Sequence, residues 1–252
     1  MLHLGVNIDH VATLRQARYA LMPGSPNAEP LVLEAARECE AAGAHSITVH
    51  LRADRRHIVD ADVFLLKKEL RVKLNLEMGN TPEILEIALR VRPDFVCLVP
   101  ENRQEITTEG GLDVTSHAAA LKATTARLKA NGTRVSFFVD PVLEHIRVSA
   151  DCGADMVELH TGTFANASGM ERQAEVLRLM AAAELAQSLG LQVNAGHGLT
   201  TRNVRDLFAV PHLAELNIGH HLVSRAITIG LRESVREMLA VLREYRAELS
   251  AG

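Results

Sequence analysis

One alternation constrains the fold of this chain most: short apolar stretches follow one another along it, with segments of helical spacing in between. Eight stretches have the length and composition of buried strands, namely residues 2–8, 46–51, 73–78, 95–100, 134–140, 156–161, 191–196 and 215–220. Helical spacing is clear over residues 29–43, 82–92 and 171–190, and a long pattern from Ser224 to Leu249 closes the chain. Eight strands, each followed by a helix, predict an α/β protein with a (β/α)8 barrel.

The length of the chain favours one domain of this kind. The sequence has 252 residues, which is ordinary for a single barrel. A doubly wound parallel sheet is the alternative, although it usually has fewer strands at this length. Because no linker or low-complexity segment interrupts the pattern, we expect residues 1–252 to form a single (β/α)8 barrel domain.

Composition argues against several classes of function. The net charge is −4 and aromatic residues make up only 3% of the chain, which does not favour a partner that is a nucleic acid. Three scattered cysteines, Cys39, Cys97 and Cys152, fit a reduced, cytoplasmic protein better than a disulfide framework. The amino-terminal residues lack the basic region of a signal peptide. No apolar run approaches the roughly 20 residues of a membrane span, so we expect no membrane association.

Polar residues recur at one end of the predicted strands. They occupy alternate positions near the carboxyl ends, whereas the opposite faces of these strands are apolar. In chain order the polar residues are Asn7, Asp9, His50, Arg52, Asn75, Glu77, Ser136, Asp140, Glu158, His160, Asn194, His197, Asn217 and His220.

In a barrel, alternate strand residues point into the lumen, and barrel enzymes carry their chemistry at the carboxyl ends of the strands. A single histidine on a strand is more often a structural residue with a satisfied hydrogen bond, and a single glutamate in a barrel could equally well hold an arginine. Each such group costs about 1–3 kcal/mol if it is buried without a partner. Because most of the strands carry polar groups at the same end, the pattern predicts an active site there.

Groups suited to binding phosphate lie near the same end. Arg18, Arg52, Arg55, Arg56 and His57 follow the first two strands, and guanidinium groups bind anions with paired hydrogen bonds. On the other side, NAGHGLT (194–200) and NIGH (217–220) place glycines after the last two strands. Exposed backbone N–H groups beside a helix start commonly bind phosphate. The sequence therefore predicts two anion pockets on one lumen.

Other chemistries receive less support. Acidic and histidine residues at the strand ends could supply metal ligands, but no HxH or HExxH motif is present, so we expect no metal. The chain has no GxSxG elbow and no GxGxxG after a strand, so neither a serine hydrolase nor a dinucleotide cofactor is predicted. Cys97 lies in an apolar run and is expected to pack. The polar segment 98–111 is long for its place and is expected to close over the site.

Seven segments together resemble one enzyme family. They read GVNIDHVATLRQAR, ITVHLRADRRHI, NLEM, LVPENRQEITTEGGLDV, VELHTG, VNAGHGLT and ELNIGH. In these segments the chain is similar to the pyridoxine 5'-phosphate synthase family of the deoxyxylulose-dependent vitamin B6 pathway. The resemblance runs from residue 5 to about residue 235. Only YALMPGSPNAEP, after Arg18, is less similar.

The resemblance implies a TIM barrel with extra helices that assembles as a homo-octamer, a tetramer of dimers. It implies ring closure between two phosphorylated substrates, 3-amino-2-oxopropyl phosphate and 1-deoxy-D-xylulose 5-phosphate. The products would be pyridoxine 5'-phosphate, inorganic phosphate and water, formed by acid–base catalysis without a cofactor or metal.

The residues that match the family's motifs carry these expected roles. The catalytic groups fall on His50, Glu77 and His197, and Glu158 matches the residue that stabilises the transition state. The resemblance assigns deoxyxylulose phosphate to Asp9, His10, Arg52, His57 and Thr107. It assigns 3-amino-2-oxopropyl phosphate to Asn7, Arg18, Gly198, Gly219 and His220.

Two alternatives to this synthase stay open at the level of sequence. A metal-dependent barrel hydrolase or isomerase would lose its turnover in a chelator. A phosphate-binding barrel without chemistry would keep the arginines and glycines but would have no need of His50, Glu77 and His197 together.

Overall fold

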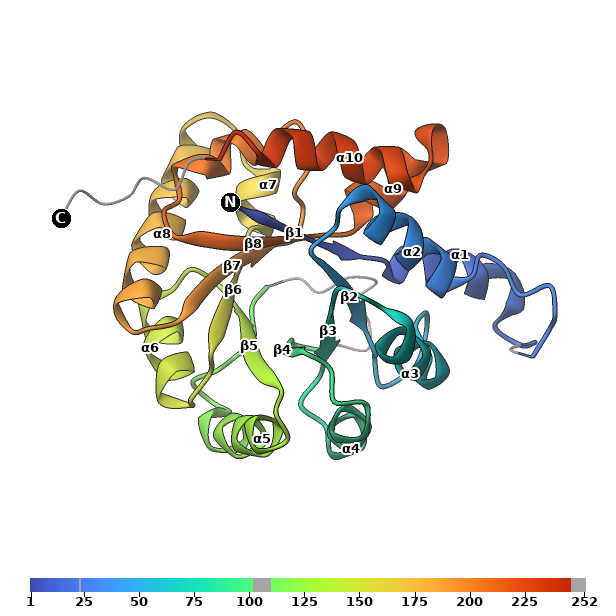
Figure 1. Cartoon of the computed structure of the whole chain (residues 1–252). Coiled ribbons are helices and arrows are strands. Elements are labelled where there is room, and N and C mark those ends of the chain that lie inside the picture. Colours follow the sequence, from blue (N-terminus) through green and yellow to red (C-terminus); the bar gives the residue numbers. More distant parts are fainter. Residues whose placement is uncertain (23, 102–109, 246–252) are drawn as a thin grey trace.

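A computed structural model describes residues 1–22, 24–101 and 110–245 of the chain. Eight parallel strands close into one barrel in sequence order, with β8 paired to β1, as Figure 1 shows. The strands are β1 (His3–Asn7), β2 (Ser46–His50), β3 (Lys73–Met78), β4 (Phe95–Leu98), β5 (Arg134–Val139), β6 (Met156–His160), β7 (Gln192–Gly196) and β8 (Leu213–Ile218). The prediction of a (β/α)8 barrel is confirmed.

The helices lie around the outside of the barrel (Figure 1). Those in the strand-to-strand connections are α1 (Asp9–Tyr19), α2 (Val32–Ala42), α3 (Asp60–Glu69), α4 (Pro82–Val91), α5 (Ala118–Ala130), α6 (Leu143–Asp151), α7 (Gly162–Asn166) and α8 (Gly169–Ser188). After β8 come α9 (His220–Ile229) and α10 (Leu231–Leu242). The first and sixth connections and the end of the chain each carry two helices, which are the expected extra helices.

Two details differ from the sequence prediction. The connection from β7 to β8 carries only a short 3-10 helix, η1 (Val204–Ala209), in place of an α-helix. The long helical pattern that begins at Ser224 is two helices, because Gly230 between them has a φ of +82°. A helix does not continue through that backbone conformation.

Strand residues alternate between the helices and the lumen. Ile47 and Val49 of β2 are fully buried in the apolar layer under the helices, where each side chain contributes about 1.5–3 kcal/mol by leaving water. The alternate residues Ser46 and Thr48 face inward. Their hydroxyls donate hydrogen bonds to β8, to Glu215 Oε1 at 2.9 Å and to Asn217 Oδ1 at 3.1 Å.

These bonds cross the lumen in front of β1, which separates β2 from β8. The strand residue between them is Gly5, and a Cβ at this position would collide with the side chains of Asn217 and Ser46. A glycine here therefore lets polar groups of two non-adjacent strands meet. None of the helices in the described ranges is both long and apolar enough to cross a membrane.

Candidate active site

A cavity of about 580 Å³ opens at the carboxyl ends of the strands. Of the predicted site residues that the structure describes, all except Arg18 line it. They are Asn7, Asp9, His10, His50, Arg52, His57, Glu77, Glu158, His197, Gly198, Gly219 and His220. Residues separated by up to 213 positions thus meet at one rim because parallel strands present the same end there.

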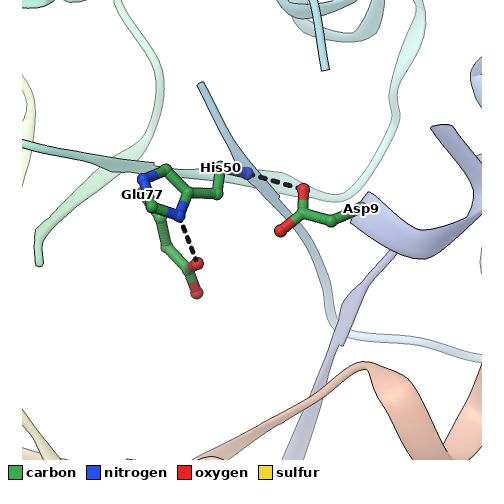
Figure 2. A group of neighbouring side chains, drawn as sticks. All are labelled: Asp9, His50 and Glu77. Carbon is green, nitrogen blue, oxygen red and sulfur yellow. Dashed lines mark hydrogen bonds and ion pairs between the residues drawn. The ribbon is translucent and has the colours of Figure 1, made fainter. Parts of the chain in front are cut away.

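His50 and Glu77 lie side by side because β2 and β3 pair in that register. His50 Nδ1 is 3.9 Å from Glu77 Oε2. The backbone N–H of His50 donates to Asp9 Oδ1 at 2.8 Å, and Figure 2 shows the three residues together. Asn7 links the two acids, since its Nδ2 donates to Asp9 Oδ2 at 2.9 Å and lies 3.5 Å from Glu77 Oε2.

Glu77 is a carboxyl group whose affinity for a proton is raised. Burial raises its pKa well above the usual value, and the charges of Asp9 and Glu158 raise it further, against a smaller lowering effect of the Asn7 hydrogen bond. A carboxyl of this kind can donate a proton at neutral pH and take it back during a reaction.

Glu158 on β6 is the second buried acid of the cavity. Burial raises its pKa to about 7, although the hydrogen bond from Asn217 Nδ2, at 2.6 Å, favours the ionised form. Asn217 is in turn held by the Thr48 hydroxyl. Glu158 is therefore balanced between its charged and neutral forms near neutral pH.

His197 follows β7 in a left-handed backbone conformation, with a φ of +84°. Such a conformation is uncommon for a residue other than glycine and is found most often at functional sites. The Thr161 hydroxyl holds this turn by donating to the carbonyl oxygens of Gly196 and His197. Burial lowers the pKa of His197 to about 4, helped by the neighbouring His160, so its ring is neutral at neutral pH.

The ring of His160 packs against that of His197, with the ring centroids 5.2 Å apart. His160 Nδ1 is 2.9 Å from Asp140 Oδ1. Sequence analysis placed both His160 and Asp140 among the lumen residues but gave them no role. Their arrangement is a carboxylate–histidine pair that packs against a predicted catalytic residue.

Groups suited to anions lie on two sides of the cavity, but Arg55 and Arg56 of the predicted set lie outside its lining and pair with acids. Arg52 is buried, and His57 next to it is fixed, since its Nδ1 accepts the N–H of Ile58 at 2.9 Å. Across the cavity, Gly198 follows β7, and Gly219 directly precedes α9. The partial positive charge at the start of a helix favours phosphate there.

The structure brings further residues to the cavity that the sequence gave no reason to choose. Thr200, Arg202, His221 and Ser224 line it, on the turn after β7 and on α9. Cys97 packs with Val99 and Phe138 as expected, but its Sγ also lies 4.0 Å from Glu158 Oε2. Glu101 contacts His50 directly, with Oε1 3.0 Å from Nε2.

One predicted substrate-binding residue, Arg18, is not brought to the cavity of its own chain. Arg18 is exposed near the end of α1, outside the cavity lining. Thr107 lies outside the described residues, as does most of the segment 98–111 that was expected to close over the site.

Asp9, His50 and Glu77 form a group that could hold a metal ion, since one ligand atom from each lies within 4.8 Å of the others. Two carboxylates and an imidazole are suitable ligands for several divalent cations. The Asn7 amide is an alternative to a metal ion as the group that holds the two carboxylates together, because it donates hydrogen bonds toward both of them. The geometry thus supports both a metal site and a metal-free acid–base group.

Comparisons with known proteins agree on one family. The family model of the pyridoxal phosphate biosynthesis protein PdxJ matches residues 4–244. A pyridoxine 5'-phosphate synthase of Akkermansia muciniphila is 57% identical over 236 residues, which are 93% of this chain and 96% of that protein. A protein of the same name from Synechococcus sp. (strain CC9902) is 49% identical over 98% of this chain and 97% of its own length.

Solved structures share the fold at low identity. Phosphoribosyl anthranilate isomerase from Thermus thermophilus has a TM-score of 0.61 at 16% identity and covers 97% of this chain and 100% of its own. The 3-keto-L-gulonate-6-phosphate decarboxylase of Vibrio cholerae has a TM-score of 0.64 at 9% identity over 97% and 99% of the two chains. Since the family model and the relatives span nearly the whole sequence, this chain belongs to the PdxJ family of pyridoxal phosphate biosynthesis proteins.

Proposed function

We propose that this enzyme condenses 3-amino-2-oxopropyl phosphate with 1-deoxy-D-xylulose 5-phosphate and closes the ring of pyridoxine 5'-phosphate, with release of phosphate and water. Family membership makes the chain an enzyme of pyridoxine 5'-phosphate synthesis, and the two substrates are the part that we propose. The observation that carries the proposal is a cavity in which His50 adjoins Glu77, a carboxyl with a raised pKa, with anion-binding groups on two sides.

The reaction needs repeated proton transfers between neighbouring atoms. An amine joins a ketone, a carbon loses a proton, water leaves, and a new carbon–carbon bond closes the ring. Glu77, with its raised pKa, supplies a proton to a departing hydroxyl, and His50, 3.9 Å away, takes one from carbon or nitrogen. Positioned acids and bases of this kind accelerate such steps by about 10²–10⁴-fold.

His197 is proposed to protonate the departing phosphate. Its pKa of about 4 leaves the ring neutral in the empty site, so it cannot donate until an anion arrives. A phosphate dianion beside the ring favours the charged imidazolium. We therefore expect that binding of the phosphorylated substrate causes His197 to become protonated. Glu158 would support the positive charge that develops on the substrates.

The cavity suits two small phosphate esters. Its volume of about 580 Å³ lies within the range of small-molecule sites. We propose that deoxyxylulose phosphate binds on the side of Asp9, His10, Arg52 and His57. The partner substrate would bind on the side of Asn7, Gly198, Gly219 and His220. Holding two dianions close together is a positioning task that contributes several kcal/mol.

Arg18 and the assembly of the enzyme are linked in this proposal. The guanidinium of Arg18 is exposed and does not line the cavity of its own chain. A role in substrate binding would therefore need a second copy of the chain to bring Arg18 to the cavity. This requirement supports the proposed homo-octamer, a tetramer of dimers. We also propose a cytoplasmic location, which suits three buried, unpaired cysteines.

The direct test is to mix the purified enzyme with both substrates and to identify the products by mass spectrometry. We expect pyridoxine 5'-phosphate and free phosphate in equal amounts, and neither product from one substrate alone. Phosphate without pyridoxine 5'-phosphate would contradict the proposal.

A metal-dependent reaction is the second candidate, and the group of Asp9, His50 and Glu77 favours it. The same assay after dialysis against a chelator distinguishes the two. Full turnover in the chelator supports the metal-free reaction. Loss of turnover that a divalent ion restores would replace it with the metal-dependent one.

A further inference from the structure

Glu101 lies just beyond β4, and its carboxylate contacts the side chain of His50. Glu101 Oε1 is 3.0 Å from His50 Nε2, and the Glu101 side chain is only 13% exposed. This contact lies on the side of the imidazole opposite to Glu77, which is 3.9 Å from Nδ1. The ring of His50 is thus held between two acids.

The carboxylate of Glu101 is fixed by groups other than His50. The backbone N–H of Ala53 donates to Oε2 at 3.2 Å, and the N–H of Gly79 donates to Oε1 at 3.2 Å. These donors belong to the loops after β2 and β3. One side chain from the end of β4 therefore connects three consecutive strand ends.

Glu101 is ionised at neutral pH. Burial acts to raise its pKa, but the hydrogen bonds from His50, Ala53 and Gly79 together outweigh burial and lower it. An ionised carboxylate only accepts hydrogen bonds. The shared hydrogen must therefore be on His50 Nε2.

This assignment decides what the other nitrogen of the ring can do. A neutral imidazole carries one hydrogen, so with Nε2 protonated, Nδ1 has a free lone pair. Nδ1 is the atom that faces Glu77. The basic nitrogen of His50 consequently points at the acid with which it is proposed to exchange protons.

Gly79 leaves the space that Glu101 occupies. A Cβ at residue 79 would lie 2.8 Å from Glu101 Cδ and 3.1 Å from its Cγ, closer than real Cβ contacts. Any larger residue would displace the carboxylate from its three partners. Residue 79 thus offers a way to move Glu101 without changing it.

We propose that Glu101 is the positioning residue that fixes the tautomer and orientation of His50, so that Nδ1 is the nitrogen that works in the reaction. The inference rests on the proposed function, in which His50 is the base. Carboxylates that orient a histidine in this way are known to fix both the tautomer and the direction of the ring.

The first experiment compares Glu101→Gln with Glu86→Gln, an exposed glutamate of α4 that pairs with Arg127. For Glu101→Gln we expect kcat to fall roughly 10- to 100-fold, with KM changed less than about threefold. Glu86→Gln should match the wild type in both quantities.

The second experiment is a double-mutant cycle. Gly79→Ala should lower kcat in the wild-type background and should have little further effect in the Glu101→Ala background, where no carboxylate remains to be displaced. Glu101→Asp should recover part of the activity lost in Glu101→Ala. Thermal unfolding of every variant checks that the fold is kept.

The outcomes separate this inference from the proposed function. Normal kcat in Glu101→Gln would overturn the role of Glu101 and leave the synthase reaction standing. Equal effects of Gly79→Ala in both backgrounds would also overturn it. Failure of the proposed function would appear in the wild type, as an absence of pyridoxine 5'-phosphate from the two substrates. A crystal structure of the wild type with Glu101 turned away from His50 would overturn the inference whatever the reaction.

Discussion

Two corners of the cavity rim use the same residue types in opposite proportions. Where β1 to β4 end, three acids lie around one imidazole: Asp9, Glu77 and Glu101 surround His50. Where β5, β6 and β7 end, the imidazoles of His160 and His197 pack together, and Asp140 contacts His160. The first corner is rich in carboxyl groups, and the second is rich in imidazoles.

This difference reverses the usual order of proton affinities. In water a glutamate loses its proton at lower pH than a histidine. Here burial and neighbouring acids raise the pKa of Glu77, while burial and a neighbouring imidazole lower that of His197 to about 4. The acid of one corner therefore has a raised affinity for a proton, whereas the imidazole of the other is neutral at neutral pH.

The largest effect should come from removing the proton of the first corner. Glu77→Gln keeps the size of the side chain but cannot exchange a proton, so we expect kcat to fall by about 10²–10⁴-fold. Substrate affinity, measured by calorimetry with one substrate at a time, should change little. Unchanged kcat in this variant would show that Glu77 is structural and that the comparison of the corners has no catalytic meaning.

Ionisation of buried Glu158 should lower the free energy of unfolding of the protein. Its pKa rises from 4.5 in the unfolded chain to about 7 in the fold, so the folded state binds the extra proton and loses stability as pH rises through that range. Glu158→Gln should therefore stabilise the protein in mildly alkaline buffer by something on the order of 1–3 kcal/mol, and much less in mildly acidic buffer. Denaturant unfolding at both pH values measures this difference. An equal gain at both would mean that the charge is not its source.

Substitution of the acid of the second corner should lower kcat less, because this acid does not contact the proposed catalytic residue directly. Asp140 touches His160 and reaches His197 only through that ring. We expect Asp140→Asn to lower kcat about tenfold, less than Glu77→Gln does. Single-turnover release of phosphate is the measurement, because His197 is proposed to act in that step. A loss as large as that of Glu77→Gln would show that the two corners are equal partners.

The smallest effect is expected from a chelator. If hydrogen bonds from Asn7 hold the two acids of the first corner, then removing divalent ions should leave kcat unchanged. Loss of turnover in the chelator would instead assign Asp9, His50 and Glu77 to a metal.

Much of this architecture could be predicted from the sequence because it depends on local periodicity. Alternation along each strand identified the lumen face, so residues such as Glu158 and His197 were placed at the rim without a structure. The break at Gly230 was missed because apolar spacing continues through it. The connection after β7 was expected to be an α-helix, but its polar residues form turns and the short helix η1.

Contacts between distant strand ends could not be predicted in this way. Glu101 reads as the start of a polar loop, and its role appears only when β4 is placed beside β3 and the loop after β2 is added. The proton affinities of Glu77 and His197 depend on burial and on neighbours far away in the sequence. Arg18 was predicted as an anion-binding arginine and by resemblance, but it is exposed and lies outside the cavity lining of its own chain.

The most direct test of this account is the protonation state of Glu77 in the resting enzyme. An infrared difference spectrum between the wild type and Glu77→Gln, recorded at neutral pH, isolates the carboxyl band of this one residue. We predict a band of a protonated carboxyl in the wild type that Glu77→Gln removes. A carboxylate band in its place would contradict the inverted order of proton affinities from which the proposed chemistry follows.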